Sequence, residues 1–238
     1  MLFKTLVSIF IVASVSIADT SKLNQDDAFY QSHVKGHLKP LWVKDTDSAM
    51  GRYNLFAKPL QLHTLIRAHG HMCDGLIIAY VELSYLLPQL FKDGIVDRTD
   101  LRVVAKNSPC LVDTSSLMSG ARINHKTLSL DNALGSDFIV QRISTQQSYR
   151  VTLKDKTFLK ALKTKEQELK TKKNVTSKDI DEVETLAYKA IEYIIHTEPN
   201  KLIKVTPLTS YQYQFKLDDI GGRSDIINKN IKRKYNEL

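Results

Sequence analysis

The sequence predicts an α+β fold, because three of its segments carry clear and different periodicities. Residues 75–92 repeat apolar side chains at three- and four-residue steps on most sides, which indicates a buried helix. Residues 176–196 carry one apolar stripe at the same spacing, which indicates an amphipathic helix. Residues 137–142 and 148–154 alternate or are β-branched on either side of a short polar segment, which is typical of a β-hairpin.

The two long helices have recognisable interruptions and ends. The apolar helix contains Pro88, which is expected to kink it or end it early, because proline has no backbone N–H to donate. The amphipathic helix is expected to be capped by Thr176 or Ser177, whose side-chain oxygens can accept from the first free N–H groups. Pro199 then stops this helix.

Shorter segments supply the remaining elements. A helix ended by Gly70 and a short helix ended by Gly120 are expected, because glycine suits the residue that follows a helix. Alternation of aromatic and polar residues near the carboxyl terminus indicates a half-buried strand. The expected helices span 60–70, 112–119 and 158–173, the last of them rich in lysine, and the expected strands span 101–106, 202–205 and 211–217.

The chain is expected to form one main domain with extensions at both ends. Residues 19–50 show no such periodicity, and we expect an irregular N-terminal leader in which the single tryptophan, Trp42, packs against the domain. The domain is expected to span 51–220 and to include a Lys-rich helical insertion over 155–197. A basic tail over 221–238 follows.

The first 18 residues have the parts of a secretory signal peptide. Lys4 precedes an apolar run over 6–12, and Ser16 and Ala18 are small residues at the two positions that a signal peptidase recognises. The apolar run is short for a membrane span, which needs about 20 residues, and polar sequence begins at Asp19. We therefore expect a periplasmic or secreted protein, with retention of the segment as a membrane anchor as the alternative.

The formal net charge of +8 at pH 7 raises the question of nucleic-acid binding. The basic residues gather along 154–173 and 229–234, where they are interleaved with Glu and Asp. Such runs are usual on solvated helix faces and tails. The charge pattern and the expected export therefore argue against a nucleic-acid partner. No second long apolar run follows, so no stable membrane span is expected after cleavage.

Two imidazoles and one thiol, His69, His71 and Cys73, fall within five residues between two of the predicted helices. Gly70 and Gly75 allow the backbone to turn tightly enough for these side chains to converge. Neutral imidazole and thiolate are preferred ligands of zinc and similar ions, and the dipole of the following helix favours the thiolate. The segment is a candidate metal site; the alternative is two loop histidines bonded to backbone.

A second thiol, Cys110, follows the predicted strand over 101–106 and precedes the predicted short helix, so the same dipole argument applies. Asp113 can cap that helix, orient a ligand or take a proton. Cys110 and Asp113 are therefore the candidate catalytic residues, and Cys110 is also a candidate metal ligand. Two cysteines in an exported protein also suggest a plain disulfide between Cys73 and Cys110, and a buried, inert thiol is a further alternative for Cys110.

These segments resemble a known family. Residues 69–76, His-Gly-His-Met-Cys-Asp-Gly-Leu, resemble the His-Gly-His-x-Cys-Pro-Gly signature of FmdE-like proteins, the family of the E subunit of formylmethanofuran dehydrogenase. Residues 110–120 resemble the family's second block, a Cys-x-x-Asp followed by a Thr-Gly turn. The hairpin over 138–153 and Glu198-Pro199 also fall where that family has a hairpin and then a closing strand. The resemblance covers roughly residues 60–210.

The sequence departs from the family pattern at several places. Asp74 stands where the family usually has Pro. Residues 121–126 replace a stretch that is commonly Thr- and Gly-rich with a Lys, and Gly135-Ser136 replaces a common Gly-Lys. These departures remove the residues from which the resemblance would supply a basic group near the site. Arg122, His125 or Lys126 can substitute for it.

The resemblance implies an α+β core in which helices pack on a mixed or antiparallel sheet, and an intertwined homodimer with a Cys/His cavity. It does not imply the dehydrogenase reaction, because that chemistry belongs to other subunits and their pterin cofactor, and a fold transfers a site more safely than a reaction. The chain has only two cysteines, so the zinc-ribbon tail of some relatives is absent.

Three functions follow as hypotheses. In the first, Cys73 and one or both of His69 and His71 hold a metal, and Cys110 is a further ligand or a nearby nucleophile. Zinc is expected, with copper or iron as alternatives, in an exported protein that acts on an unknown small molecule. In the second, Cys73 and Cys110 cycle between dithiol and disulfide without a metal. In the third, the chain is a non-catalytic partner of an exported molybdoenzyme or electron-transfer complex. The sequence does not decide whether the protein is an enzyme.

Overall fold

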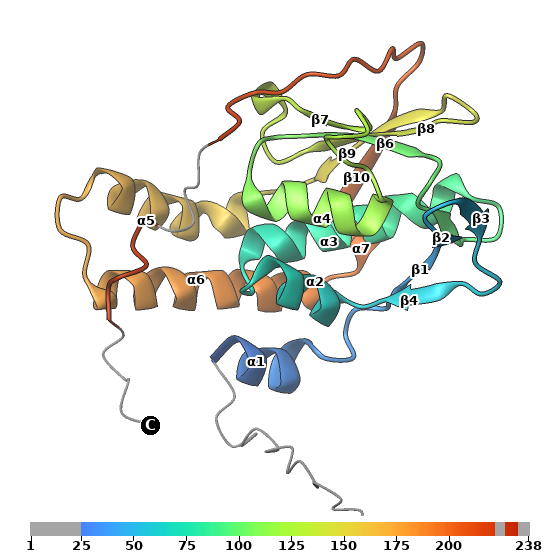
Figure 1. Cartoon of the computed structure of the whole chain (residues 1–238). Coiled ribbons are helices and arrows are strands. Elements are labelled where there is room, and N and C mark those ends of the chain that lie inside the picture. Colours follow the sequence, from blue (N-terminus) through green and yellow to red (C-terminus); the bar gives the residue numbers. More distant parts are fainter. Residues whose placement is uncertain (1–24, 222–226, 233–238) are drawn as a thin grey trace, which may run out of the picture.

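The structure, a computed structural model, describes residues 25–221 and 227–232, so the expected signal peptide lies outside the described residues. One five-stranded sheet is covered on one face by a layer of helices (Figure 1), and the predicted α+β class is confirmed. The helices are α1 (Gln25–Phe29), α2 (Leu62–His69), α3 (Asp74–Leu86), α4 (Pro109–Ser119), α5 (Lys160–Thr171), α6 (Ser177–Ile195) and α7 (Pro199–Leu202). Short π- or 3-10-helical turns are η1 (Tyr30–Val34), η2 (Leu87–Leu90), η3 (Asn132–Leu134) and η4 (Thr157–Leu159).

The main sheet has the strand order β10-β9-β8-β6-β7. All of its neighbouring strands are antiparallel except β6 and β7, which are parallel, so the sheet is mixed as expected. A second sheet has the order β4-β1-β5, and β2 and β3 form a separate hairpin. The strands are β1 (Leu41–Lys44), β2 (Thr46–Ser48), β3 (Gly51–Tyr53), β4 (Lys58–Leu60), β5 (Val96–Asp97), β6 (Leu101–Ala105), β7 (Leu128–Leu130), β8 (Phe138–Arg142), β9 (Ser148–Leu153) and β10 (Ile203–Pro207).

Helix α3 is the centre of the core. It contacts β9 and β10 of the sheet and packs against helices α4 and α6 (Figure 1). Ten of its 13 residues are buried, because apolar side chains surround it on most sides as the sequence predicts. Helix α3 ends at Leu86 and the chain continues as a 3-10 turn around Pro88, which confirms that the proline ends the helix early.

Several predicted helix ends are confirmed. Gly70 and Gly120 follow α2 and α4 in the left-handed conformation, with φ of 101° and 73°. Thr176 caps α6 and forms a capping box with Asp179. Helix α4 begins at Pro109, three residues earlier than predicted, because the fixed φ of proline suits the first position of a helix.

The expected irregular leader is wrong for the part of it that the structure describes. Residues 25–50 form α1, β1 and β2, and β1 pairs with both β4 and β5. The side chains of Leu41 and Val43 are buried, and alternation along the strand turns Trp42 outward. Trp42 is therefore 49% exposed instead of packed against the domain as expected.

The expected strand over 211–217 is also wrong. Its only ladder contact among the described residues is one bridge between Leu217 and Leu130 of β7. Beside β7, the N–H of Lys216 donates to the Ser129 hydroxyl at 2.7 Å, so a side chain takes the place of a ladder carbonyl. The alternation of aromatic and polar residues therefore predicted an extended backbone over 211–217, but not whether this segment pairs with a neighbouring strand.

No helix within residues 25–221 and 227–232 has the length and apolar character needed to cross a membrane.

Candidate functional site

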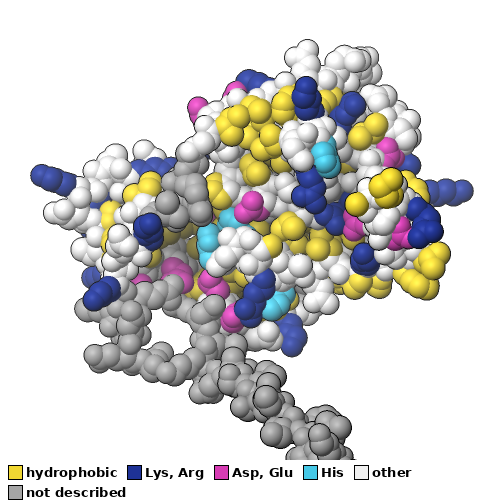
Figure 2. All heavy atoms as spheres, in the orientation of Figure 1, with side chains coloured by type: hydrophobic (Ala, Val, Ile, Leu, Met, Phe, Trp, Pro, Cys, Tyr) yellow, Lys and Arg dark blue, Asp and Glu magenta, His cyan; other side chains and the backbone are white. Residues whose placement is uncertain are grey.

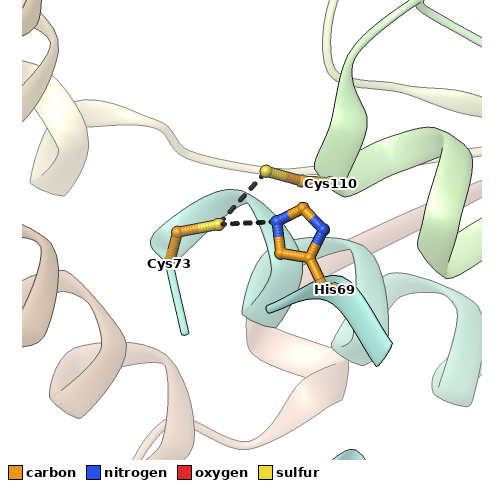
Figure 3. A group of neighbouring side chains, drawn as sticks. All are labelled: His69, Cys73 and Cys110. Atoms are coloured by element: carbon orange, nitrogen blue, oxygen red, sulfur yellow. Dashed lines mark hydrogen bonds between the residues drawn. The ribbon is translucent and has the colours of Figure 1, made fainter. Parts of the chain in front are cut away.

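Three helix ends bring together the side chains that the two motifs predict. His69 is the last residue of α2, and the left-handed Gly70 turns the chain back after it. Cys73 is the residue that caps α3, and its sulfur accepts the N–H of Leu76 at 3.4 Å. Cys110 is the second residue of α4, which packs against both α2 and α3. Figure 3 shows the imidazole and the two sulfurs pointing toward a common point.

The donor atoms of His69, Cys73 and Cys110 all lie within 4.8 Å of one another, and they form the one such group among the described residues. The two sulfurs are 3.1 Å apart, and the sulfur of Cys73 is 3.9 Å from Nε2 of His69 (Figure 3). The two cysteines form no disulfide in this structure. The predicted convergence of imidazole and thiol donors is therefore present.

Asp113 fixes the orientation of His69. Nδ1 of His69 donates to Oδ2 of Asp113 at 2.7 Å, which leaves Nε2 facing the sulfurs. The His69 side chain is 2% exposed, whereas that of Asp113 is 44% exposed. Asp113 lies beyond the first turn of α4, so it does not cap this helix. Of the three roles considered for Asp113, the geometry matches the orientation of a ligand, the arrangement usual behind histidines that bind metals.

The charges of the three groups depend on one another. Hydrogen bonding with Cys73, together with His69, lowers the pKa of Cys110 to about 5 against the opposing effect of burial. Hydrogen bonding with Cys110 and burial raise the pKa of Cys73. Hydrogen bonding with Cys110 raises the pKa of His69 to about 9, again against burial. The site therefore holds a Cys110 thiolate beside a His69 imidazolium, a pair of the kind found around reactive cysteines.

Gly75 lies inside α3, where its role differs from the flexible turn that the sequence suggests. A Cβ atom at this position would lie 3.2 Å from both Cβ and Sγ of Cys110. Helices α3 and α4 can approach closely enough to bring the sulfurs together because position 75 has no side chain.

His71 lies at the edge of this group. Its ring packs against that of His69, with 4.5 Å between the ring centroids and 39° between their planes. His71 is exposed and is not one of the three residues whose donor atoms converge. The structure thus brings together three of the four predicted metal ligands.

A cleft of about 710 Å³ opens beside Cys110, bounded by the amino ends of α3 and α4 and by η4 and α5. Arg122, His125 and Lys126, the residues expected to supply a basic group, are not in its lining. Lys156 instead donates to Ser136 at 2.9 Å, so an ammonium lies beside the position where the family pattern has Lys. The lysines that line the cleft are Lys106, Lys156, Lys160, Lys163 and Lys170.

Sequence reasoning missed these lysines as site residues. Four of them belong to the Lys-rich insertion, and its interpretation as a solvated helix face is incomplete because one side of α5 and η4 borders the cleft. Figure 2 shows Lys and Arg side chains spread over this face of the molecule, some of them at the end that α5 and α6 form. The high density of lysines is visible in the sequence. Their position next to Cys110 is not.

Comparisons with known proteins agree with the two motifs. The family model described as "FmdE, Molybdenum formylmethanofuran dehydrogenase operon" matches residues 68–204, which include both motifs and the hairpin. No curated protein matches the chain. Among solved structures, an FmdE-like protein of the tungsten formylmethanofuran dehydrogenase type from Syntrophus aciditrophicus is 15% identical, with a TM-score of 0.42 over 62% of this chain and 69% of that chain.

Proposed function

The chain belongs to the FmdE family, and on that basis we propose that it is an exported metal-binding protein whose ion is held by His69, Cys73 and Cys110. The convergence of these three donor atoms within 4.8 Å is the observation that carries the proposal. One imidazole and two sulfurs that converge in this way are typical metal ligands.

The donor set fits zinc best. Zinc is commonly bound by thiolate and neutral imidazole, and three protein ligands are typical of catalytic zinc sites, where water or substrate completes the coordination. Copper and iron also accept such ligands and remain alternatives. The ion would supply Lewis acidity or an activated water in the cleft beside Cys110.

The residues of the chain have distinct roles in this proposal. His69 offers Nε2, which releases its proton when an ion binds, because Asp113 holds its Nδ1–H. The pKa of Cys110, lowered to about 5 by hydrogen bonding with Cys73, already makes this sulfur a thiolate at neutral pH, as a metal ligand or a nucleophile must be. His71, exposed beside the His69 ring, is assigned to shielding the site and not to binding the ion.

Metal analysis of the purified protein tests the proposal. Protein purified without chelator should carry about one zinc per chain, whereas Cys73→Ser and Cys110→Ser should each lose most of it. His71→Ala should retain its metal and is the matched control, because it removes a histidine from the same turn. Wild-type protein with metal far below one equivalent, in both reducing and oxidising buffers, contradicts the proposal, as does equal loss in all three variants.

One observation favours a second function. The sulfurs of Cys73 and Cys110 are 3.1 Å apart, and the thiolate at Cys110 is the form that attacks a disulfide. A thiol-based redox enzyme without metal would use this pair. Thiol titration of metal-free protein in glutathione buffers separates the two functions: a reversible two-electron couple supports redox cycling, and two thiols that stay reduced across the range support the metal site.

Export and self-association are further parts of the proposal. The signal-peptide pattern of the first 18 residues supports export, and cell fractionation with mass spectrometry of the mature amino terminus tests it. Membership of the family supports a homodimer, as do large apolar side chains exposed on the β1–β4 part of the molecule. These side chains are Trp42, Met50, Leu55 and Phe56. Light scattering of the mature protein tests the dimer.

A further inference from the structure

The cleft beside Cys110 is built from segments that lie far apart in the sequence. Gly75 and Ile78 of α3 and Ser108 and Leu111 at the start of α4 line it near the thiol. Turn η4 and one side of α5 line it on the other side. A molecule in the cleft would therefore touch Cys110 and the Lys-rich helix at the same time.

The charges around the cleft are unequal. Five lysines line it, against three carboxylates, Asp74, Asp155 and Glu166. Lys163 is engaged, since Nζ lies 3.1 Å from Asp74 and 3.0 Å from Glu166. Lys156 is engaged as well, by ion pairing with a buried carboxylate outside the lining.

Three of the lysines have no such partner. Lys106, Lys160 and Lys170 are exposed, and they form no ion pair with any residue in the described part of the chain. Cations that line a concave surface add their potentials there and attract anions from solution.

The amino end of α4 adds to the positive potential. Ser108 precedes this helix, its hydroxyl makes no capping hydrogen bond, and the first turn contains no acidic residue. Helix α3 differs, because Asp74 already lies in its first turn. The first N–H groups of a helix lack partners within the helix and favour a negative group. The positive end of α4, where Ser108 and Cys110 line the cleft, therefore has no acidic residue in its first turn to offset it, whereas that of α3 has one.

From this combination we infer that the cleft binds a small organic anion. Its carboxylate or phosphate group lies at the amino end of α4 beside Cys110, and the positive potential of Lys160 and Lys170 in the same cleft attracts it. The inference rests on the proposed function, since it names the substrate class of that site, but its charge argument does not require a metal. Lys106, at the end of β6, borders the same cleft and completes the cationic rim.

Alkylation of Cys110 measures this selectivity directly. Iodoacetate and iodoacetamide both transfer their CH₂ carbon to a thiolate sulfur with loss of iodide, but only iodoacetate is an anion. The ratio of the two rate constants cancels changes in the pKa or exposure of the thiol, because these affect both reagents. Trypsin places Cys73 in peptide 68–92 and Cys110 in peptide 107–122, so mass spectrometry follows each thiol separately.

The test uses reduced, metal-free protein at low ionic strength. In Lys160→Gln/Lys170→Gln the iodoacetate-to-iodoacetamide ratio at Cys110 should fall several-fold, because two positive charges that line the same cleft are removed. The matched control, Lys189→Gln/Lys204→Gln, removes the same charge from exposed lysines outside the cleft and should leave the ratio unchanged. Salt at about 1 M should abolish the difference, because the screening length is then about 3 Å.

Two results overturn the inference: an unchanged ratio in the cleft variant, or an equal fall in the control variant. Competition at constant ionic strength then distinguishes the headgroups, with malonate and inorganic phosphate as probes. The one that slows alkylation more identifies the group, and failure of both to slow it also overturns the inference. Because no metal is present, a protein that shows the selectivity but carries no metal on purification contradicts the proposed function alone.

Discussion

The Cys/His group and the cluster around Asp137 are both interior polar regions, but their hydrogen-bonding demands are met differently. Asp137 is buried, and its oxygens accept hydrogen bonds from Arg150, Thr152 and Lys156. In the Cys/His group only Nδ1 of His69 has a strong partner, while the sulfurs face Nε2 and each other. A buried polar group that is satisfied within the chain indicates a structural role, whereas converging donors without strong partners indicate a ligand.

Asp113→Asn should have the largest effect, which is on the proposed metal site. An amide does not hold the His69 ring with the charge of a carboxylate, and loss of such a partner typically weakens metal binding about 10–100-fold. Competition titration with a zinc-sensitive dye measures the affinity, and thermal unfolding of metal-free protein should change little. Asp181→Asn on α6 is the control. Equal zinc affinity in wild type and Asp113→Asn would contradict the assignment of the Cys/His group to ligand binding and of the Asp137 cluster to structure.

Asp137→Asn should act on stability and not on metal affinity. Burial alone raises the pKa of Asp137, but hydrogen bonds from Thr152, Arg150 and Lys156 lower it overall. The variant should lose about 1–2 kcal/mol in urea unfolding at pH 7, since the cationic partners are half-exposed and stay solvated.

The pH dependence of that loss follows from the direction of the pKa shift. A carboxyl with a lowered pKa in the folded state contributes stability above its unfolded pKa of about 3.9, and the contribution is lost as the pH falls below that value. The difference between wild type and Asp137→Asn should therefore be largest near pH 7 and shrink toward pH 3. A difference that grows on acidification would contradict the structural role.

The sequence could predict the part of the Cys/His group that lies within one continuous segment. His69 and Cys73 lie within one helix-turn-helix segment, so local spacing was enough to place their side chains together. Cys110 was predicted as a candidate from its motif, but its 3.1 Å approach to Cys73 depends on α4 packing against Gly75, a contact between distant segments. The two long helices and the hairpin were predicted for the same reason, because their periodic patterns also lie within one continuous segment each.

The parts that failed depend on tertiary contacts. The leader over 25–50 is ordered by strand pairing with β4 and β5, which no pattern inside the leader encodes. The strand expected over 211–217 lost its ladder because the Ser129 hydroxyl bonds its backbone instead. The cationic side of the cleft depends on how α5 folds back beside Cys110. Composition located these lysines in the sequence but not in space.

Glu82 is a third kind of interior polar group and gives the smallest expected effect. It lies on α3, fully buried, and neither carboxylate oxygen has a hydrogen-bond partner in the described part of the structure. Burial, reinforced by the charge of Asp137, raises the pKa of Glu82 well above its usual value. Unlike the thiols of the Cys/His group, this carboxyl has no second donor beside it with which to hold an ion, since it is not in the converging group.

Glu82→Gln should therefore stabilise the protein, by about 1 kcal/mol at pH 7, because the amide has a similar shape and needs no proton to enter the core neutral. A group with a raised pKa in the folded state contributes stability below its unfolded pKa, about 4.3, and loses it as the pH rises toward the folded pKa. The gain in stability from Glu82→Gln should vanish near pH 4. Both substitutions thus have their largest effect near pH 7, but Glu82→Gln stabilises the protein and Asp137→Asn destabilises it. Urea unfolding at pH 4 and pH 7 measures both; a destabilised Gln variant at pH 7 would mean that the Glu82 carboxylate has a cationic partner when the protein is in solution.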